Sequence, residues 1–362
     1  MRLHPILTDR LGMRLPIIQA PMAGGTDTPA MVAAVSEAGG LGCIGAAYLS
    51  PTQILEAAKA VRARTARPFS INLFSPDADA AEMGDPAATL ARIAPYFAER
   101  GLPPPAPPQL APYTFEDQFA AALETGAAMI SIVFGRFSPE ATAAARAKGM
   151  LVVGAANSVA EGRALKESGV DAIVAQGSEA GGHRAVFLGP AHDSLVGTMA
   201  LVPQLVDATQ LPILAAGGIM DGRGIAAALA LGACGVQMGT AFLNCDESGI
   251  SAPYRQAVDA ARDTDTRLTR AFSGRYARGL RNRFIDDMVA ADTAGEILPF
   301  PWQNALTRPL RTASAQVGDA GMLSMWAGQG VAMARRESAT HLMARLEQET
   351  TAALNALGQW LA

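Results

Sequence analysis

Short apolar runs alternate with longer amphipathic stretches over residues 1–243. The runs are rich in Ile, Val, Leu and Ala and are too short for helices, which is typical of buried parallel strands. We expect strands at residues 15–21, 41–47, 69–74, 129–134, 151–155, 172–175, 213–216 and 236–242. Most stretches between them have the apolar spacing of helices, and several begin at Ser-Pro or Thr-Pro, a common helix start. Eight such strand–helix units predict an α/β fold, the TIM (β/α)8 barrel.

Two stretches depart from this alternation. Residues 75–112 include the run GLPPPAPPQLAP at 101–112, which favours polyproline II and a stiff surface loop; a docking motif for aromatic grooves is the alternative. Residues 244–312 are richer in charge, and we expect an inserted, mostly helical substrate domain there. Its arginines fit a solvated helix face with one or two ion pairs, with anion binding as the alternative. We therefore expect a barrel at 1–243, a helical subdomain at 244–312 and a segment at 313–362 that returns to the barrel.

The composition supports a globular chain with a large core, because 50% of the 362 residues are hydrophobic and 17% are charged. The net charge of -4, without a basic block, argues against nucleic-acid binding. Cys43, Cys234 and Cys245 are widely spaced, which argues against disulfides and a structural metal site. The first residues are too polar for a secretion signal, and residues 224–245 fit a helix followed by a strand better than a membrane span. We therefore expect a cytoplasmic protein that binds no membrane and no metal.

The most distinctive chemistry follows the expected strand at 172–175, where the sequence continues QGSEAGGHRAVF. Gln176 lies at the carboxyl end of that strand, the edge where strand–helix folds bind ligands. Gly181 and Gly182 allow the backbone to approach a flat ligand, and His183 is a titratable group beside them. These residues predict a cofactor site with an acid or a base. A surface loop with an ordinary solvated histidine is the alternative.

Two further strands also end in residues that suit a ligand. Gly217 and Gly218 follow one strand, and Gly239 and Thr240 follow the next. Barrels of this kind commonly bind a phosphate between the loops after strands seven and eight, where backbone N–H groups point at the anion. We expect a phosphate site here, with ordinary turn glycines as the alternative.

Taken together, QAPMAGG, INLF, GSEAGGHRAVF, AAGGIMDGRGIAAAL, GVQMGTAFL and WAGQG resemble the class I nitronate monooxygenases, formerly called 2-nitropropane dioxygenases. The resemblance extends from Gln19 to Gly330. It implies a barrel with a helical substrate domain that binds FMN without a nicotinamide partner. Such enzymes oxidise alkyl nitronates, for example propionate 3-nitronate, with dioxygen to a carbonyl compound and nitrite. Neutral nitroalkanes and a homodimer are further options that the sequence leaves open.

The resemblance also implies roles for single residues. His183 matches the catalytic histidine, which would hold the nitro oxygens when protonated or take the α-proton of a nitroalkane when neutral. The residues that would contact FMN or close its site are Met22, Asn72, Gln176, Gly181, Gly182, Gly217, Gly218, Gly239, Thr240, Trp326, Gln329 and Gly330. From the residues alone, Trp326 would fill core. The proline-rich excursion and Ala185, where glycine is more usual, are departures from the family.

Three other functions fit parts of this pattern. An NADH-dependent FMN enoyl-thioester reductase of the FabK type has the same barrel and a related glycine–histidine loop. An NADH–quinone reductase is a second version of that alternative. A flavin-binding sensor would keep the phosphate site without needing His183, but nothing in the sequence resembles an output domain.

Overall fold

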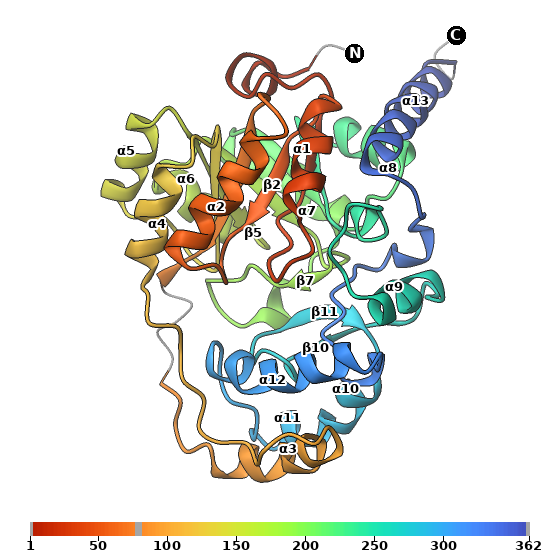
Figure 1. Cartoon of the computed structure of the whole chain (residues 1–362). Helices are drawn as coiled ribbons and strands as arrows, with labels where there is room; N and C mark the ends of the chain where they lie inside the picture. The colour runs from red at the N-terminus through yellow and green to blue at the C-terminus, as the bar shows by residue number, and fades with distance from the viewer. Residues whose placement is uncertain (1–2, 77–81, 360–362) are drawn as a thin grey trace.

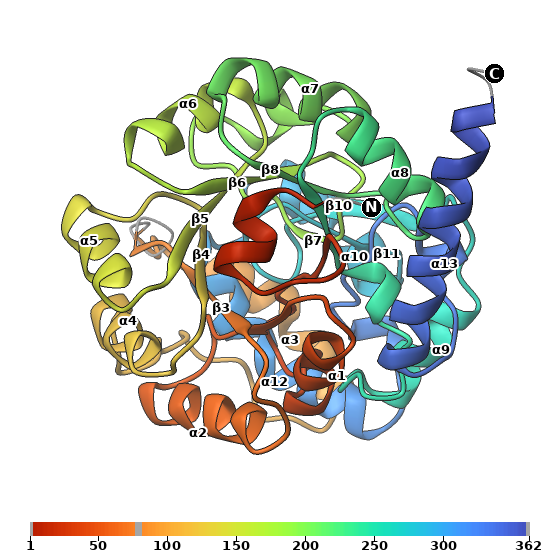
Figure 2. The ribbon, with the colours of Figure 1, turned by 90° about the horizontal axis from the view of Figure 1, so that it is seen from above.

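The computed structural model describes residues 3–76 and 82–359 of the chain, and it confirms the predicted barrel. Eight parallel strands form one sheet in the order β1-β9-β8-β6-β5-β4-β3-β2. The strands are β1 (Ile17–Gln19), β2 (Gly42–Gly45), β3 (Phe69–Phe74), β4 (Met129–Val133), β5 (Leu151–Ala156), β6 (Ala172–Gln176), β8 (Ile213–Ala216) and β9 (Gly235–Met238). A parallel bridge between Ile18 and Leu41 joins the two ends of the sheet and closes the ring seen from above in Figure 2.

In the described part of the chain, seven helices that connect successive barrel strands pack around this ring. They are α1 (Pro29–Glu37), α2 (Pro51–Arg62), α4 (Phe115–Leu123), α5 (Pro139–Ala147), α6 (Val159–Glu167), α7 (Thr198–Thr209) and α8 (Gly222–Ala230). The predicted Ser-Pro and Thr-Pro starts are confirmed, because Thr28, Ser50 and Ser138 each cap a helix whose first residue is proline. The stretch 224–245 is a helix followed by a strand, as expected. No helix in the described part of the chain is long and apolar enough to cross a membrane.

The eighth strand is shorter than the sequence predicts. We expected a strand at 236–242, but β9 ends at Met238 and a short 3-10 helix, η4 (Thr240–Phe242), follows it. The reason is the backbone of Gly239, whose torsion angles of φ -108° and ψ -66° turn the chain out of the sheet. The predicted pair Gly239 and Thr240 therefore lies in the loop after the strand instead of at its end.

The barrel is closed at the amino ends of its strands. Leu7, Leu11 and Met13, in and just after η1 (Ile6–Arg10), are buried against side chains that point into the barrel. Inward-pointing residues such as Met129 and Leu214 belong to the same apolar cluster. The interior is thus packed with apolar side chains at this end.

A second lobe covers the carboxyl ends, below the barrel in Figure 1. Its helices are α3 (Ala87–Glu99), α9 (Ala252–Asp259), α10 (Arg283–Asp287), α11 (Val289–Thr293) and α12 (Trp302–Gln316). It also contains an antiparallel sheet of β7 (Gly182–His183), β10 (Thr266–Thr269) and β11 (Ala277–Leu280), in the order β10-β11-β7. The segment that we expected to be mostly helical therefore contains strands, and the boundary expected at residue 312 falls inside α12.

The excursion after β3 belongs to this lobe. Ile93 and Phe97 of α3 pack in one apolar cluster with Phe272, Phe284 and Met322. The chain then returns to the barrel through residues 102–111, which form neither helix nor strand and are mostly exposed. This agrees with the surface loop predicted for the proline-rich run.

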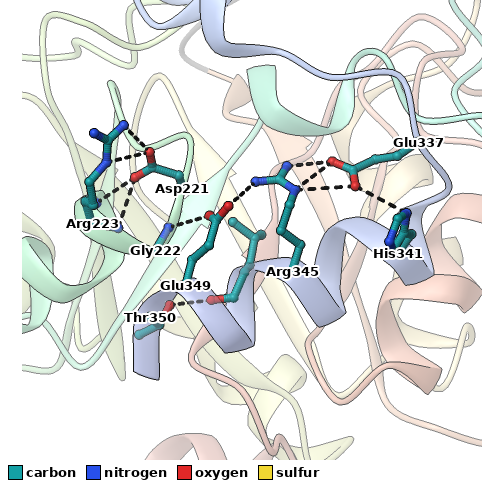
Figure 3. A network of polar contacts seen from close by, with 10 residues as sticks. Asp221, Gly222, Arg223, Glu337, His341, Arg345, Glu349 and Thr350 are labelled. Atoms are coloured by element: carbon teal, nitrogen blue, oxygen red, sulfur yellow. Dashed lines mark hydrogen bonds and ion pairs between the residues drawn. The ribbon is translucent and has the colours of Figure 1, made fainter. Parts of the chain in front are cut away.

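The C-terminal helix α13 (Ala339–Gly358) packs against α8 and α1 and is tied to the barrel by a chain of polar contacts, shown in Figure 3. Arg345 lies between two carboxylates, 2.5 Å from Glu337 and 2.9 Å from Glu349. Glu349 in turn accepts a hydrogen bond of 3.1 Å from the backbone N–H of Gly222, the first residue of α8. The far end of the chain therefore supports the loop that follows β8.

Replacing Arg345 tests this support. Arg345→Met leaves two carboxylates, of which Glu337 is only 9% exposed, without their shared partner. We expect the free energy of unfolding in urea to fall by about 2 kcal/mol. The matched control is Arg14→Met. Arg14 contacts Glu347, which lies in α13 as Arg345 does, and the substitution breaks that contact. Because the Arg14 side chain is 60% exposed, that loss should stay below about 1 kcal/mol. Equal losses would contradict the role assigned to Arg345.

Candidate active site

A cavity of about 570 Å³ opens at the carboxyl ends of the barrel strands, between the barrel and the second lobe. Its volume lies within the range of small-molecule and cofactor sites, roughly 300–1,000 Å³. All but one of the predicted site residues line it: Met22, Asn72, Gln176, Gly181, Gly182, His183, Gly217, Gly218, Gly239, Thr240, Trp326 and Gly330. Gln329 is the exception, because its side chain is exposed and only its backbone N–H is engaged, with the carbonyl of Glu179 at 2.9 Å.

His183 lies where the barrel meets the second lobe. It is part of β7, and the backbone register pairs it with Ala277 of β11. Aromatic rings enclose the imidazole on several sides. The distances between ring centroids are 5.4 Å to Trp326, 5.8 Å to Phe134, 6.0 Å to Phe300 and 6.3 Å to Phe74. The histidine is therefore not a solvated loop residue, and Trp326 is a wall of the cavity as well as a core residue.

This environment keeps His183 uncharged. Desolvation is the largest effect, and the positive charges of Arg275 and Arg311 add to it; together they lower the pKa of His183 to about 3. The imidazole is therefore neutral near neutral pH. Of the two forms that we considered for His183, the neutral one is therefore expected, and Arg275 and Arg311 are the positive charges near it.

The loop that carries His183 is held by Gln176. The side-chain amide of Gln176 donates to the carbonyl of His183 at 3.0 Å, and its oxygen accepts from the backbone N–H of Ala185 at 2.9 Å. Asn157 donates to the same oxygen at 2.8 Å. Arg184, which is 1% exposed, donates to the backbone carbonyl of Gln176 at 3.0 Å. Since Ala185 contributes its backbone, the departure from glycine at this position leaves the contact intact.

Two other predicted residues are fixed by the barrel itself. Asn72 is 2% exposed, and its amide donates to Ser131 of the neighbouring strand, 2.9 Å from the hydroxyl and 3.2 Å from the carbonyl. The backbone N–H of Met22 donates to Asp27 at 2.8 Å, and the same carboxylate oxygen accepts from Gly45 at 2.7 Å. Burial raises the pKa of Asp27 to about 7. The loop after β1 is thus pinned to β2 by a carboxyl group that sequence patterns did not single out.

Glycines bring several loops together at the floor of the cavity. Gly217 and Gly218 have φ values of 112° and 72°, which favour glycine, and they turn the chain directly after β8. A Cβ on Gly181 would lie 2.5 Å from the backbone nitrogen of Gly328, so the His183 loop and the WAGQG loop meet backbone to backbone. The N–H of Gly328 donates to the Thr240 hydroxyl at 2.9 Å. In the described part of the chain no protein acceptor is found for the N–H groups of Gly218, Gly239 and Thr240.

Unpaired positive charge lies on the side of the second lobe. Arg311 lines the cavity and donates to the Ser324 hydroxyl at 3.2 Å and to the Asn304 side chain at 2.9 Å. The Arg275 guanidinium lies 4.0 Å from the centroid of the Phe134 ring. Desolvation lowers the pKa of both arginines to about 10, so both keep their charge near neutral pH. Among the described residues neither arginine has a carboxylate partner within 4.0 Å.

Phe134 adopts an unusual backbone conformation beside these arginines. Its φ of 72° lies in the left-handed region that non-glycine residues seldom occupy. Such a conformation costs on the order of 1–3 kcal/mol and is found where surrounding contacts hold it in place. Here the Phe134 ring contacts the Arg275 guanidinium and the His183 imidazole.

Residues 5–349 match the protein-family model described as nitronate monooxygenase. The chain belongs to the nitronate monooxygenase family. A probable nitronate monooxygenase of Staphylococcus aureus strain Newman is 42% identical over 345 residues, 94% of this chain and 95% of the relative. The protein of strain MRSA252 is 41% identical over the same length. The resemblance inferred from the motifs is confirmed, and the protein is an oxidoreductase of this family.

Two solved structures share the fold of this protein. Nitroalkane oxidase from Streptomyces ansochromogenes superposes with a TM-score of 0.89 at 38% sequence identity, over 97% of this chain and 99% of that chain. FabK from Thermotoga maritima superposes with a TM-score of 0.77 at 27% identity, over 99% of both chains. One of the alternatives considered from the sequence, the FabK type, is therefore represented among structures of this shape, but the identity to the nitroalkane oxidase is higher.

The sequence did not indicate the aromatic rings around His183 or the arginines near it. Phe74 and Phe134 stand at the carboxyl ends of β3 and β4, and that position was the available signal. Arg281 and Arg283 form the exposed ion pairs expected of the arginine-rich stretch. Arg275, in the same stretch, instead turns toward Phe134. Nothing in the local sequence separates these arginines, because the difference lies in what each one packs against.

The neutral state of His183 predicts a pH dependence of stability. Between a folded pKa of about 3 and an unfolded pKa near about 6.5, the unfolded chain binds one more proton at this site, so stability falls as pH falls. Between pH 6 and pH 5, we expect the free energy of unfolding of the wild type to fall by about 1 kcal/mol more than that of His183→Asn. Urea unfolding of both proteins at pH 7, 6 and 5 measures this difference. Parallel pH profiles would contradict it.

Proposed function

We propose that this protein oxidises alkyl nitronates with dioxygen, using FMN, and releases a carbonyl compound and nitrite. The observation that carries the proposal is Arg311, which has no carboxylate partner among the described residues and lies with His183 in a cavity with a glycine-lined floor. This combination suits a substrate that is itself an anion, because the anion would supply the missing charge partner.

The residues present fit a flavin mononucleotide. The N–H groups of Gly218, Gly239 and Thr240 would hold the phosphate, since the structure gives them no protein acceptor. Asn72 of β3 and Met22 in the loop after β1 would lie against the ring system, and Trp326 would close the site. When bound, FMN would supply the electron acceptor and the reaction with dioxygen. The roles of single residues toward FMN are assigned by the family resemblance together with their place in the cavity.

Arginine accounts for the preference for an anion. Arg311 and Arg308 both line the cavity, and both come from α12 of the second lobe. Arg308 forms no ion pair within the described residues. Propionate 3-nitronate carries a carboxylate as well as the nitronate group, so two arginines spaced along one helix suit its two charges. We therefore propose it as a substrate and expect small nitronates that lack the carboxylate to bind less tightly.

His183 would contribute a proton acceptor. A nitronate has already lost its α-proton, so its oxidation needs no base, and a neutral imidazole can donate or accept a hydrogen bond there. A neutral nitroalkane must lose that proton first, and only an uncharged imidazole can take it. Arg311 would then stabilise the anion that forms. The division of charge between arginine and histidine thus allows both substrates at one site.

An NADH-dependent enoyl-thioester reductase is the second candidate, because the fold is shared with FabK. The two functions differ in the electron donor. We expect rapid loss of flavin absorbance when the FMN-loaded protein is mixed with propionate 3-nitronate without air, and no change with NADH. Stopped-flow absorbance measures both reactions on one preparation. Loss of absorbance with NADH alone would move the assignment to the reductases, with enoyl thioesters and quinones as the next compounds to test.

His183→Asn separates the two substrate classes. We expect kcat/KM for neutral nitroethane to fall by at least about 100-fold, since a positioned base contributes roughly 10²–10⁴-fold. The same variant should keep oxidation of the preformed nitronate within about tenfold of wild type, because no proton is removed. Steady-state oxygen consumption with each substrate measures both values. Equal losses on the two substrates would show that His183 is not the base.

A further inference from the structure

Ser273 makes the hydrogen bond that the structure gives to the His183 ring. Its hydroxyl oxygen lies 2.9 Å from Nε2 of His183. Ser273 is 1% exposed and stands in the turn between β10 and β11, 90 residues from the histidine in sequence. The second lobe therefore delivers this hydroxyl to a ring carried by a loop of the barrel.

The hydroxyl proton of Ser273 has another partner. The carbonyl oxygen of Arg275 lies 3.0 Å from the hydroxyl oxygen, and a carbonyl can only accept. The backbone N–H of Arg275 also points at the same hydroxyl oxygen, at 3.4 Å, and can only donate. Since a serine hydroxyl has a single proton and it goes to the carbonyl, the oxygen is left to accept from Nε2. The proton in the hydrogen bond between Ser273 and His183 is therefore bonded to Nε2 of the imidazole.

The other ring nitrogen is open to the cavity. Among the described residues Nδ1 of His183 has no hydrogen-bond partner, and it is not one of the fully buried polar atoms that lack one. His183 itself lines the cavity. A neutral imidazole with its proton on Nε2 has its free electron pair on Nδ1, and that pair is accessible to a bound molecule.

We propose that Ser273 is a positioning residue that keeps His183 in the Nε2–H tautomer, so that Nδ1 is the nitrogen that meets the substrate. The assignment of the tautomer stands on the hydrogen bonds alone, and its consequence for catalysis rests on the proposed function. In the opposite arrangement Ser273 would donate to Nε2, the Arg275 carbonyl would lose its donor, and Nδ1 would carry the proton. That nitrogen could then no longer accept the α-proton of a nitroalkane.

The direct test is the tautomer itself. Protein labelled with ¹⁵N-histidine and loaded with FMN is examined at pH 7 by long-range ¹H–¹⁵N NMR, and His183→Asn identifies the signals of His183. We expect Nε2 to have the chemical shift of a protonated ring nitrogen and Nδ1 that of an unprotonated one. A proton on Nδ1 overturns the proposal, whatever the protein oxidises. The expected tautomer in a protein without nitronate activity would refute the proposed function and leave this inference standing.

Ser273→Ala tests the consequence. Without the acceptor we expect a mixture of both tautomers and a fall in kcat/KM for neutral nitroethane of roughly tenfold, a part of what the base contributes. Oxidation of propionate 3-nitronate should stay within about twofold, and Ser273→Thr, which keeps the hydroxyl, should restore the Nε2–H form. A pure Nε2–H tautomer in Ser273→Ala would overturn the role of the serine.

The matched control is Ser314→Ala. Ser314 is also a fully buried serine of the second lobe, but its hydroxyl accepts from Arg100 at 3.2 Å and lies outside the cavity. This variant should leave the tautomer of His183 and both activities unchanged. An effect on the tautomer equal to that of Ser273→Ala would show that any loss of a buried hydroxyl loosens the lobe, and would overturn the specific role of Ser273.

Discussion

The antiparallel pairing of β7 with β11 is the contact on which the site depends. The loop after β6 starts as an ordinary barrel loop, and two of its residues then join the sheet of the second lobe, where His183 pairs with Ala277. This pairing places the partly buried histidine among aromatic rings from both parts of the molecule. It also brings the turn that carries Ser273 and Arg275 against the imidazole. One backbone contact thus joins the barrel groups assigned to the cofactor to the lobe groups assigned to the substrate.

Desolvation has different consequences for the imidazole of His183 and for the guanidinium of Arg311. An imidazole has an ordinary pKa near about 6.5, so the loss of water and the nearby arginines are enough to keep His183 neutral. A guanidinium starts above about 12, so the same environment lowers the pKa of Arg311 to about 10 and leaves it charged. The enclosure therefore leaves a neutral imidazole and a charged guanidinium in one cavity. The proposed use of both nitroalkanes and nitronates depends on this difference in charge.

Contacts distant in sequence also support the opposite side of the cavity. Glu349 near the end of the chain binds the N–H of Gly222, directly after the loop formed by Gly217 and Gly218. Asp27 connects the loop that carries Met22 to β2. In both cases a carboxylate outside the recognisable motifs fixes the position of a residue inside them. The motifs could therefore be found from the sequence, whereas the groups that hold them in place could not.

The sequence by itself determined the barrel and most of the residues around its cavity. The bounds of β3 and β8 are as predicted, and helices start where Ser-Pro and Thr-Pro predicted them, because hydrophobic period and capping act between near neighbours in the chain. Only the tertiary structure decided the charge of His183, its Ser273 partner and the exclusion of Gln329 from the cavity. Desolvation, ion pairing and hydrogen bonding at these positions depend on groups that the chain brings together only after folding, such as a hydroxyl 90 residues from its histidine.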